Sequence, residues 1–364
     1  MEKVRIGTIG CGGIAKSKHL PAESKNPDVE LVAFCDIIRE RAEFAAKTYG
    51  TEDAKIYTDY KQLLADENVD AVLILTPNYL HCEMTVAALD AGKHVLCEKP
   101  MAMNYAEAQK MIEARDRSGK ILTIGYQNRY RKDVLYLTEL SREGVFGEIY
   151  YAEANAIRRR GVPTWGVFID EEQQGGGPLI DIGTHALDLT LFIMNNYKPK
   201  YCVGKTFHKL NGQTNTGNAF GDWDTEKFTA EDAAFGFVVM ENGALINLRS
   251  SWALNTTYVR EACATFCGDK AGAEIADDFS NKICINGILG GKQYTLEPNV
   301  NAGSVPFFSG AKGLNSVDFE ARTFTNAVLG KGELYVTAEQ AAVVTRILEG
   351  IYVSEKTGKP YYFD

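Results

Sequence analysis

The sequence has no apolar stretch that is both long enough and free enough of charge to span a bilayer, and no block of like charge longer than Arg158-Arg159-Arg160. Its net charge of −9 makes nucleic acid and anionic membranes poor partners. No internal repeat and no low-complexity segment occurs. These absences favour an ordinary soluble globular protein whose partner is a small, neutral or weakly charged molecule.

Cysteine and histidine occur, but not in patterns typical of metal sites or disulfide frameworks. The eight cysteines are scattered and form no C-x-x-C pair, and the one close pair, Cys263 and Cys267, alternates as in a strand. We interpret them as core thiols of a protein from a reducing compartment. His19 and His208 have no acidic or cysteine neighbour at ligand spacing, so we expect no metal site. The first strand begins near residue 4, which leaves no room for a signal peptide and predicts a cytoplasmic protein.

Length and composition predict two domains. With ~150 residues per domain, 364 residues correspond to two, and 45% hydrophobic residues suffice for a core in each. Helix and strand signals alternate up to residue 126, which predicts a doubly wound parallel sheet. Strand patterns then dominate, with an Asn-Gly hairpin over 235–252 and a polar loop over 211–227 of a length typical of lids, subunit contacts or disorder. We expect an α/β chain: a Rossmann domain at 1–126 and an α+β domain with a large, mostly antiparallel open sheet at 127–364.

The first thirty-six residues predict a dinucleotide-binding unit. A buried strand at 4–9 leads into a G-x-G-x-x-A turn at 10–15, then a helix, a second strand and Asp36. Gly10 permits the tight turn, and Gly12 allows the backbone to approach a pyrophosphate. Asp36 can accept hydrogen bonds from a ribose diol and would repel a 2′-phosphate. The pattern therefore favours NAD over NADP as the cofactor.

Further polar residues follow the next strands, at the edge where ligands bind in such sheets. Thr76-Pro77-Asn78 follows the strand at 71–75, although Asn78 could instead be a helix N-cap. Glu98-Lys99-Pro100 follows the strand at 94–97, and Pro100 could have a cis bond. Lys99 leaves a buried strand, so we expect its amine to point into the crevice. His81 and Tyr126 also lie next to this crevice.

A second group of polar residues lies on an apolar helix expected over 179–194, introduced by a glycine-rich turn at 175–178. Asp181, His185 and Asp188 fall within an arc of about 60° on one helix face. They could be an Asp–His pair that only satisfies itself. Beside Lys99, however, they resemble a proton-handling site for an alcohol, in which His185 or Lys99 takes the hydroxyl proton while Asp181 orients and polarises.

Two weaker signals lie in the loop before this helix. Trp165 could stack on a sugar face or could pin its loop to the core. The arginine run that includes Arg158 could contact substrate or could be a solvated strand end.

These motifs together resemble the glucose–fructose oxidoreductase, inositol dehydrogenase and rhizopine-catabolism (Gfo/Idh/MocA) family. The glycine turn, Thr76-Pro77-Asn78 with His81, Glu98-Lys99-Pro100, and the run 176–185 with its D-x-G-x-H match the family's motifs in order and spacing. The resemblance implies Lys99, Asp181 and His185 as the catalytic residues. It implies substrate contacts at Lys99, Tyr126, Arg158, Trp165, Asp181 and His185, and cofactor contacts at Gly10, Gly12, Gly13, Ile14, Asp36, Thr76, Asn78, His81, Glu98, Lys99 and Gln127.

The resemblance implies an NAD-dependent oxidoreductase that transfers hydride between a secondary hydroxyl of a sugar, glycoside or cyclic polyol and nicotinamide. The loop 158–165 is similar to that of members that oxidise glycosides at C3 to 3-keto sugars. The run Gln127-Asn128-Arg129 departs from the arginine pair that members often carry there. Two alternatives are a glycosidase that oxidises C3 transiently and eliminates the aglycone, and a regulator that senses NAD and sugar. The family also implies a homo-oligomer, a dimer, tetramer or larger assembly, formed through the C-terminal sheet.

Overall fold

The computed structural model describes residues 3–276, 282–300 and 315–363. The chain divides into two compact units. The first contains the residues up to Tyr130 together with a C-terminal segment that ends at Ala342, and the second contains those from Arg131 together with those from Val343 onward. The expected domain boundaries, 1–126 and 127–364, do not include this return of the chain to the first unit, and they stay a prediction.

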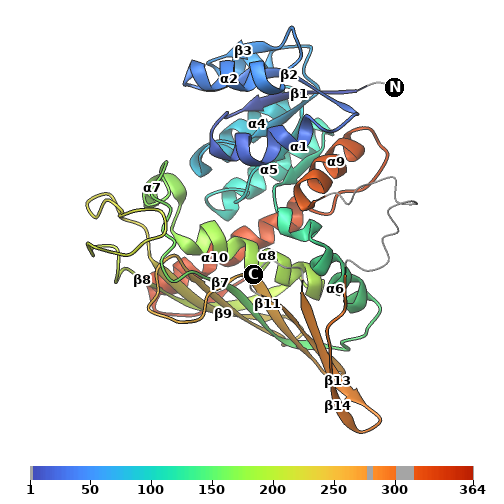
Figure 1. The fold of residues 1–364 in the computed structure, drawn as a ribbon, viewed down its shortest axis with the longest axis vertical. Coiled ribbons are helices and arrows are strands. Elements are labelled where there is room, and N and C mark those ends of the chain that lie inside the picture. The colour runs from blue at the N-terminus through green and yellow to red at the C-terminus, as the bar shows by residue number, and fades with distance from the viewer. Residues whose placement is uncertain (1–2, 277–281, 301–314, 364) are drawn as a thin grey trace. The chain divides into compact units, whose positions relative to one another are not determined.

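The first unit is built on a six-stranded parallel sheet with helices along it (Figure 1). The strand order β3-β2-β1-β4-β5-β6 changes direction between β1 and β4, which makes the sheet doubly wound, as expected. Apart from the edge strand β3, its strands are mostly apolar and buried because helices cover a parallel sheet. The strands are β1 (Val4–Ile9), β2 (Val29–Cys35), β3 (Lys55–Tyr57), β4 (Ala71–Ile74), β5 (His94–Cys97) and β6 (Leu122–Ile124), and the helices are α1 (Leu20–Glu23), α2 (Arg39–Tyr49), α3 (Tyr60–Leu64), α4 (His81–Asp90), α5 (Tyr105–Ser118) and α9 (Ser316–Val328).

The second unit is built on a nine-stranded sheet in the order β14-β13-β12-β11-β7-β10-β9-β8-β15. Of its described pairs only β7 with β10 is parallel, so the predicted, mostly antiparallel sheet is confirmed. The strands are β7 (Ile149–Ile157), β8 (Pro199–Phe207), β9 (Ala233–Met240), β10 (Leu245–Ser251), β11 (Arg260–Gly268), β12 (Ala271–Ile275), β13 (Ile283–Leu289), β14 (Lys292–Leu296) and β15 (Tyr361–Tyr362), and the helices are α6 (Lys132–Arg142), α7 (Glu171–Gln174), α8 (Thr184–Met194) and α10 (Ala338–Thr357), within which the unit boundary falls.

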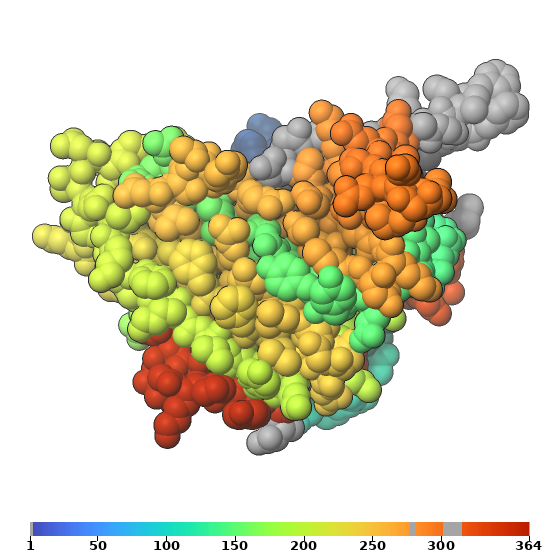
Figure 2. Space-filling model, turned by 90° about the horizontal axis from the view of Figure 1, so that it is seen from below, coloured from blue at the N-terminus to red at the C-terminus, as the bar shows by residue number. Residues whose placement is uncertain are grey.

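The two faces of the nine-stranded sheet differ. Helix α8 packs on β7 and β11, and Gly204 of β8 and Gly236 of β9 leave room for Ile351 of α10. On the opposite face, strands lie side by side, and no helix of the described residues crosses them (Figure 2). The second unit therefore has one covered and one open sheet face. No helix in the described part of the chain is long and apolar enough to cross a membrane.

Two helices begin differently from the sequence-based expectation. The residues Ala15–His19 after the glycine turn form a π-helical turn, η1, and Leu179–Gly183 form another, η4, which runs into α8. A π-turn contains more residues than an α-turn, so the assumed 100° per residue does not hold between Asp181 and His185. The predicted 60° polar arc is thus not the geometry of this helix start. Such turns occur frequently at functional sites.

Candidate active site

The glycine turn after β1 has the backbone that a dinucleotide needs. Gly10 has φ +94, and a Cβ there would lie 2.5 Å from the carbonyl oxygen of Leu75, so only glycine fits. A Cβ on Gly12 or Gly13 would meet no described atom within 4 Å. The backbone of the turn is therefore open to a large group such as a pyrophosphate.

Asp36 is tied to this turn by its carboxylate. The N–H of Cys11 donates to Asp36 Oδ2 at 2.9 Å, and the N–H of Ile38 donates to Oδ1 at 2.8 Å. The adjacent Ile37 side chain is 88% exposed and carries no cation that could pair with a 2′-phosphate. Thr76 Oγ1, just past the end of β4, is buried and has no hydrogen-bond partner among the described residues. These features fit NAD, which Gly10, Gly12, Gly13, partly exposed Ile14, Asp36 and Thr76 would hold.

Lys99 follows β5 and is next to a buried cluster of charged side chains that contains Glu98, Lys18 and His19. Its N–H donates to Glu98 Oε2 at 3.0 Å, while Glu98 Oε1 lies 2.7 Å from Lys18 Nζ and 2.7 Å from His19 Nε2. Burial disfavours the charge, but Lys18 and His19 together hold the pKa of Glu98 well below its usual range. Glu98 therefore remains an anion that fixes the backbone of Lys99.

The same cluster reaches α9 and the turn that follows β6. Lys18 Nζ also lies 2.9 Å from Glu320 Oε2 of α9 and donates to Gln127 Oε1 at 3.1 Å. Gln127, a predicted cofactor residue, thus contacts the lysine of the cluster. Sequence reasoning missed Lys18, His19 and Glu320 as members of this cluster because they are far from Glu98 in the chain and carry no motif.

His81 joins the two loops at the ligand-binding edge. Its Nδ1 lies 2.7 Å from the carbonyl oxygen of Pro100, and its Nε2 lies 3.0 Å from that of Thr76. Two carbonyl acceptors favour the charged ring, but burial outweighs them and lowers the pKa of His81. The Lys99–Pro100 bond is cis, as considered from the sequence. The fully buried His81 therefore holds the turn that carries Lys99.

Two other predicted residues of the first unit are buried. Tyr126 is fully buried after β6, and Asn78 is 9% exposed at the start of the turn η2 (Asn78–Leu80). The N-cap residue of α4 is Leu80, so Asn78 is not its cap. Their contacts with a ligand stay predictions.

The second unit presents Asp181 and His185 on η4 and α8. The indole N–H of fully buried Trp252 donates to Asp181 Oδ2 at 2.9 Å. Within the described stretch from Leu179 to Ile193, His185 is the one side chain that is not buried. An anchored buried carboxylate thus lies one turn before an imidazole that is only partly buried, an arrangement suited to proton transfer. Lys99, the third predicted catalytic residue, belongs to the first unit.

Glu231 anchors the glycine-rich turn that precedes Asp181. Its carboxylate accepts from the N–H groups of Gly177 at 2.7 Å and Leu179 at 3.2 Å and from the hydroxyl of Tyr352 at 2.9 Å. A Cβ on Gly176 would lie 2.0 Å from the Tyr352 hydroxyl, which explains the glycine there. Burial raises the pKa of Glu231 to about 7. The glycines therefore allow the turn to close onto Glu231.

Arg158 is not a solvated strand end. Its Nε donates to Glu261 Oε2 at 2.8 Å, its Nη2 contacts Glu261 Oε1, and Nη1 donates to the carbonyl of Gly161 at 3.0 Å. Burial lowers the pKa of Arg158, but Glu261 and, more weakly, Asp181 outweigh it and raise the pKa overall. Arg158 and Asp181 therefore influence each other electrostatically. Trp165 is 53% exposed in a neighbouring loop and is not pinned into the core.

Comparisons with known proteins agree with this architecture. A model of an oxidoreductase family with an NAD-binding Rossmann fold (GFO_IDH_MocA) matches residues 4–126, and a GFO/IDH/MocA C-terminal domain matches 134–274. D-glucoside 3-dehydrogenase of Escherichia coli K12 is 36% identical over 98% of this chain and 96% of that protein. The chain belongs to the Gfo/Idh/MocA family of oxidoreductases. As a family member it is an enzyme that uses NAD, and the predicted family, fold and cofactor are confirmed.

Two further similarities extend the comparison. A putative UDP-kanosamine synthase oxidoreductase subunit of Amycolatopsis mediterranei is 35% identical over 69% of each chain. The solved structure of aldose-aldose oxidoreductase from Caulobacter crescentus, complexed with glycerol, superposes with a TM-score of 0.81 over the whole of both chains at 22% identity. At that identity the structure shows a shared fold alone.

Proposed function

We propose that this member of the family is an NAD-dependent dehydrogenase of neutral glycosides that oxidises the C3 hydroxyl of a pyranoside to a ketone. The observation that carries the proposal is the 36% identity with D-glucoside 3-dehydrogenase, because it extends over 98% of the chain and so includes both units. The anchored Asp181 and the partly buried His185 support it, since alcohol oxidation needs a group that removes the hydroxyl proton.

NAD, which Gly10, Gly12 and Asp36 would hold, would supply the hydride acceptor for C3 in the proposed reaction. His185 takes the proton of the C3 hydroxyl, so the C–H and O–H bonds break as the C=O bond forms. Asp181, held by Trp252, stabilises the imidazolium that results. Lys99 is the third proposed catalytic residue, on a turn that Glu98 and His81 hold in place.

An absorbance scan at 340 nm tests the proposal. The purified protein is mixed with a panel of pyranosides and inositols, with and without added NAD. NADH that forms only with added NAD and a glucoside is the expected result. Absence of NADH with every glucoside would contradict the proposal, and release of aglycone without NADH accumulation would favour the oxidation–elimination glycosidase.

We also propose that the open face of the nine-stranded sheet joins copies of the chain into a homo-oligomer. Val203 of β8 and Phe237 of β9 are register partners and are 41% and 51% exposed, and Tyr362 of β15 is 59% exposed. Exposed apolar side chains on adjacent strands favour a contact surface. Light scattering after size exclusion measures the assembly, and a monomer at micromolar concentration would contradict the proposal.

A further inference from the structure

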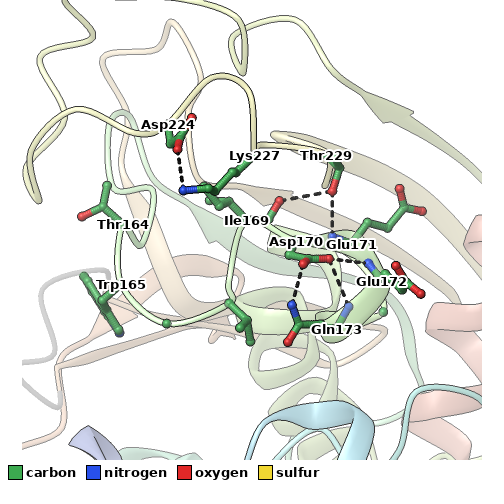
Figure 3. Close-up of a pocket in the computed structure, with 13 residues that line it drawn as sticks. Thr164, Trp165, Ile169, Asp170, Glu171, Glu172, Gln173, Asp224, Lys227 and Thr229 are labelled. Atoms are coloured by element: carbon green, nitrogen blue, oxygen red, sulfur yellow. Dashed lines mark hydrogen bonds and ion pairs between the residues drawn. The ribbon is translucent and has the colours of Figure 1, made fainter.

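A cavity of about 840 Å³ lies in the second unit between two loops (Figure 3). One wall is the segment from Thr164 to Gly175, which includes α7, and the other contains Asp224, Lys227 and Thr229. The volume falls within the range typical of small-molecule sites. It is larger than the volume that a single sugar ring occupies. The predicted functional residue Trp165 lines this cavity.

Hydrogen bonds join the two walls. Thr164 Oγ1 donates to the carbonyl of Phe220 at 2.7 Å, and the N–H of Glu171 donates to Thr229 Oγ1 at 3.0 Å. The Asn218 side chain accepts from the N–H of Val162 at 2.9 Å and donates to its carbonyl at 3.0 Å. The polar loop expected over 211–227 is therefore a built wall of the cavity. A preformed site loses less conformational entropy when it binds a ligand.

Trp165 provides an aromatic surface in this cavity. Its ring is nearly perpendicular to those of Phe168 and Phe220, with centroid distances of 5.9 Å and 4.9 Å, and 53% of the residue remains exposed. The two edge contacts fix the plane of the indole. Such a plane can pack against the C–H bonds of a pyranose face.

The charged side chains that line the cavity are mostly acidic and disfavour the binding of anionic ligands. Four carboxylates, those of Asp170, Glu171, Glu172 and Asp224, line it together with one ammonium group, and that Lys227 Nζ lies 2.9 Å from Asp224 Oδ2 (Figure 3). Asp170 accepts bonds from the backbone of its own helix, whereas Glu171 and Glu172 are exposed. Exposed carboxylates can accept hydrogen bonds from sugar hydroxyls, but they repel phosphate and carboxylate groups.

The cavity adjoins the chain segment that carries Asp181. Gly175 lines it, and Asp181 is six residues further on, so their backbones lie at most ~20 Å apart. We propose that this cavity binds a second, neutral sugar ring of the substrate, so that the enzyme acts on glycosides of two or more rings and rejects phosphorylated sugars, sugar nucleotides and uronides. This inference rests on the proposed oxidation of glycosides.

The test compares kcat/KM for a methyl glucoside and for a neutral disaccharide in wild type, Trp165→Ala and Trp165→Phe. We expect Trp165→Ala to lose at least tenfold more kcat/KM for the disaccharide than for the methyl glucoside, and Trp165→Phe to restore most of that difference. Tyr150→Ala is the matched control, because Tyr150 is 55% exposed and does not line the cavity. Its ratio of the two kcat/KM values should equal that of wild type.

A second arm tests charge. A disaccharide with a glucuronate second ring should be a poor substrate of wild type, and Glu171→Gln with Glu172→Gln should improve its kcat/KM about tenfold. Equal losses for both substrates in Trp165→Ala, or no gain with the glucuronide, would overturn the inference. Calorimetry of the neutral disaccharide with Lys99→Ala separates the two proposals. If binding depends on Trp165 while wild type turns over no glycoside, the proposed activity is refuted and the proposed sugar-binding cavity is not.

Discussion

At the scale of single residues, the hydrogen bond from Trp252 to Asp181 determines how the buried carboxylate is held. An indole N–H is a fixed donor, and a bond to a charged acceptor contributes about 1.5–3 kcal/mol. Trp252 is fully buried at the end of β10, so it has little freedom to turn away. It is therefore a positioning residue for the proposed proton transfer.

We expect Trp252→Phe to lower kcat by roughly tenfold or more, because Asp181 loses the donor that orients it. Glycoside oxidation followed at 340 nm measures the effect. Trp223→Phe is the matched control: Trp223 is also buried and donates its indole N–H, at 2.8 Å, to the carbonyl of Asn211. Similar losses of kcat in both variants would mean that the effect is a general loss of packing.

Lys18 is a second single residue for which we expect a large effect, in this case on the free energy of unfolding. Its removal in Lys18→Met would leave Glu320 buried without its cation and Glu98 with His19 alone, and we expect a loss of about 3–5 kcal/mol in the free energy of unfolding. Urea unfolding followed by far-UV circular dichroism measures it. Lys25→Met, which removes an exposed lysine whose Nζ lies 3.9 Å from Asp318 Oδ1, should change stability by less than about 1 kcal/mol. A comparable loss in both would contradict a special role for the cluster.

At the scale of elements, the glycine-rich turn and the Glu231 carboxylate that accepts its hydrogen bonds together form the start of η4. Burial raises the pKa of Glu231 to about 7, against about 4.3 in an unfolded chain. The folded state thus binds the proton more tightly between these values. The contribution of Glu231 to stability is complete below about pH 4.3 and is lost as pH rises through about 7.

We therefore expect Glu231→Gln to become more stable relative to wild type as pH rises from 4.5 to 8, by about 1–3 kcal/mol. All three tryptophans belong to the second unit, so urea unfolding followed by tryptophan fluorescence reports on it. Parallel pH profiles of the two proteins would show that Glu231 does not titrate in this range.

Elements were predictable from the sequence where local pattern determines them. The strand before Gly10 and the hairpin at 235–252 depend on periodicity and turn residues, and they occur where expected. The π-turns η1 and η4 were not predictable, because a hydrogen-bond shift of one residue leaves no trace in the pattern of apolar residues.

The candidate site was predictable only in part. Lys99, Asp181 and His185 stand in recognisable motifs, and their catalytic roles stay predictions. Trp252 and Lys18 carry no motif, since each acts on a partner 71 or 80 residues away. Such contacts follow from the packing of the whole unit, which spacing along the chain does not reveal.

At the scale of the whole molecule, the open sheet face is the surface through which we propose that copies of the chain associate. We expect Phe237→Glu to weaken the proposed assembly, because a charge would be buried between sheets. Light scattering over a dilution series measures the shift toward monomer. Tyr258→Glu, at a loop position that is 76% exposed, is the control and should leave the assembly unchanged. An unchanged assembly in Phe237→Glu would place the interface elsewhere.

The whole enzyme also depends on Asp36 in a way that matters for cofactor engineering. The carboxylate accepts hydrogen bonds from two backbone N–H groups, one in the glycine turn and one after β2, besides its expected role at the ribose. A redesign toward NADP that only removes the acid would leave both groups without their acceptor and loosen the loop that we expect to bind the pyrophosphate. A successful exchange has to replace that acceptor and add a cation for the phosphate at the same time.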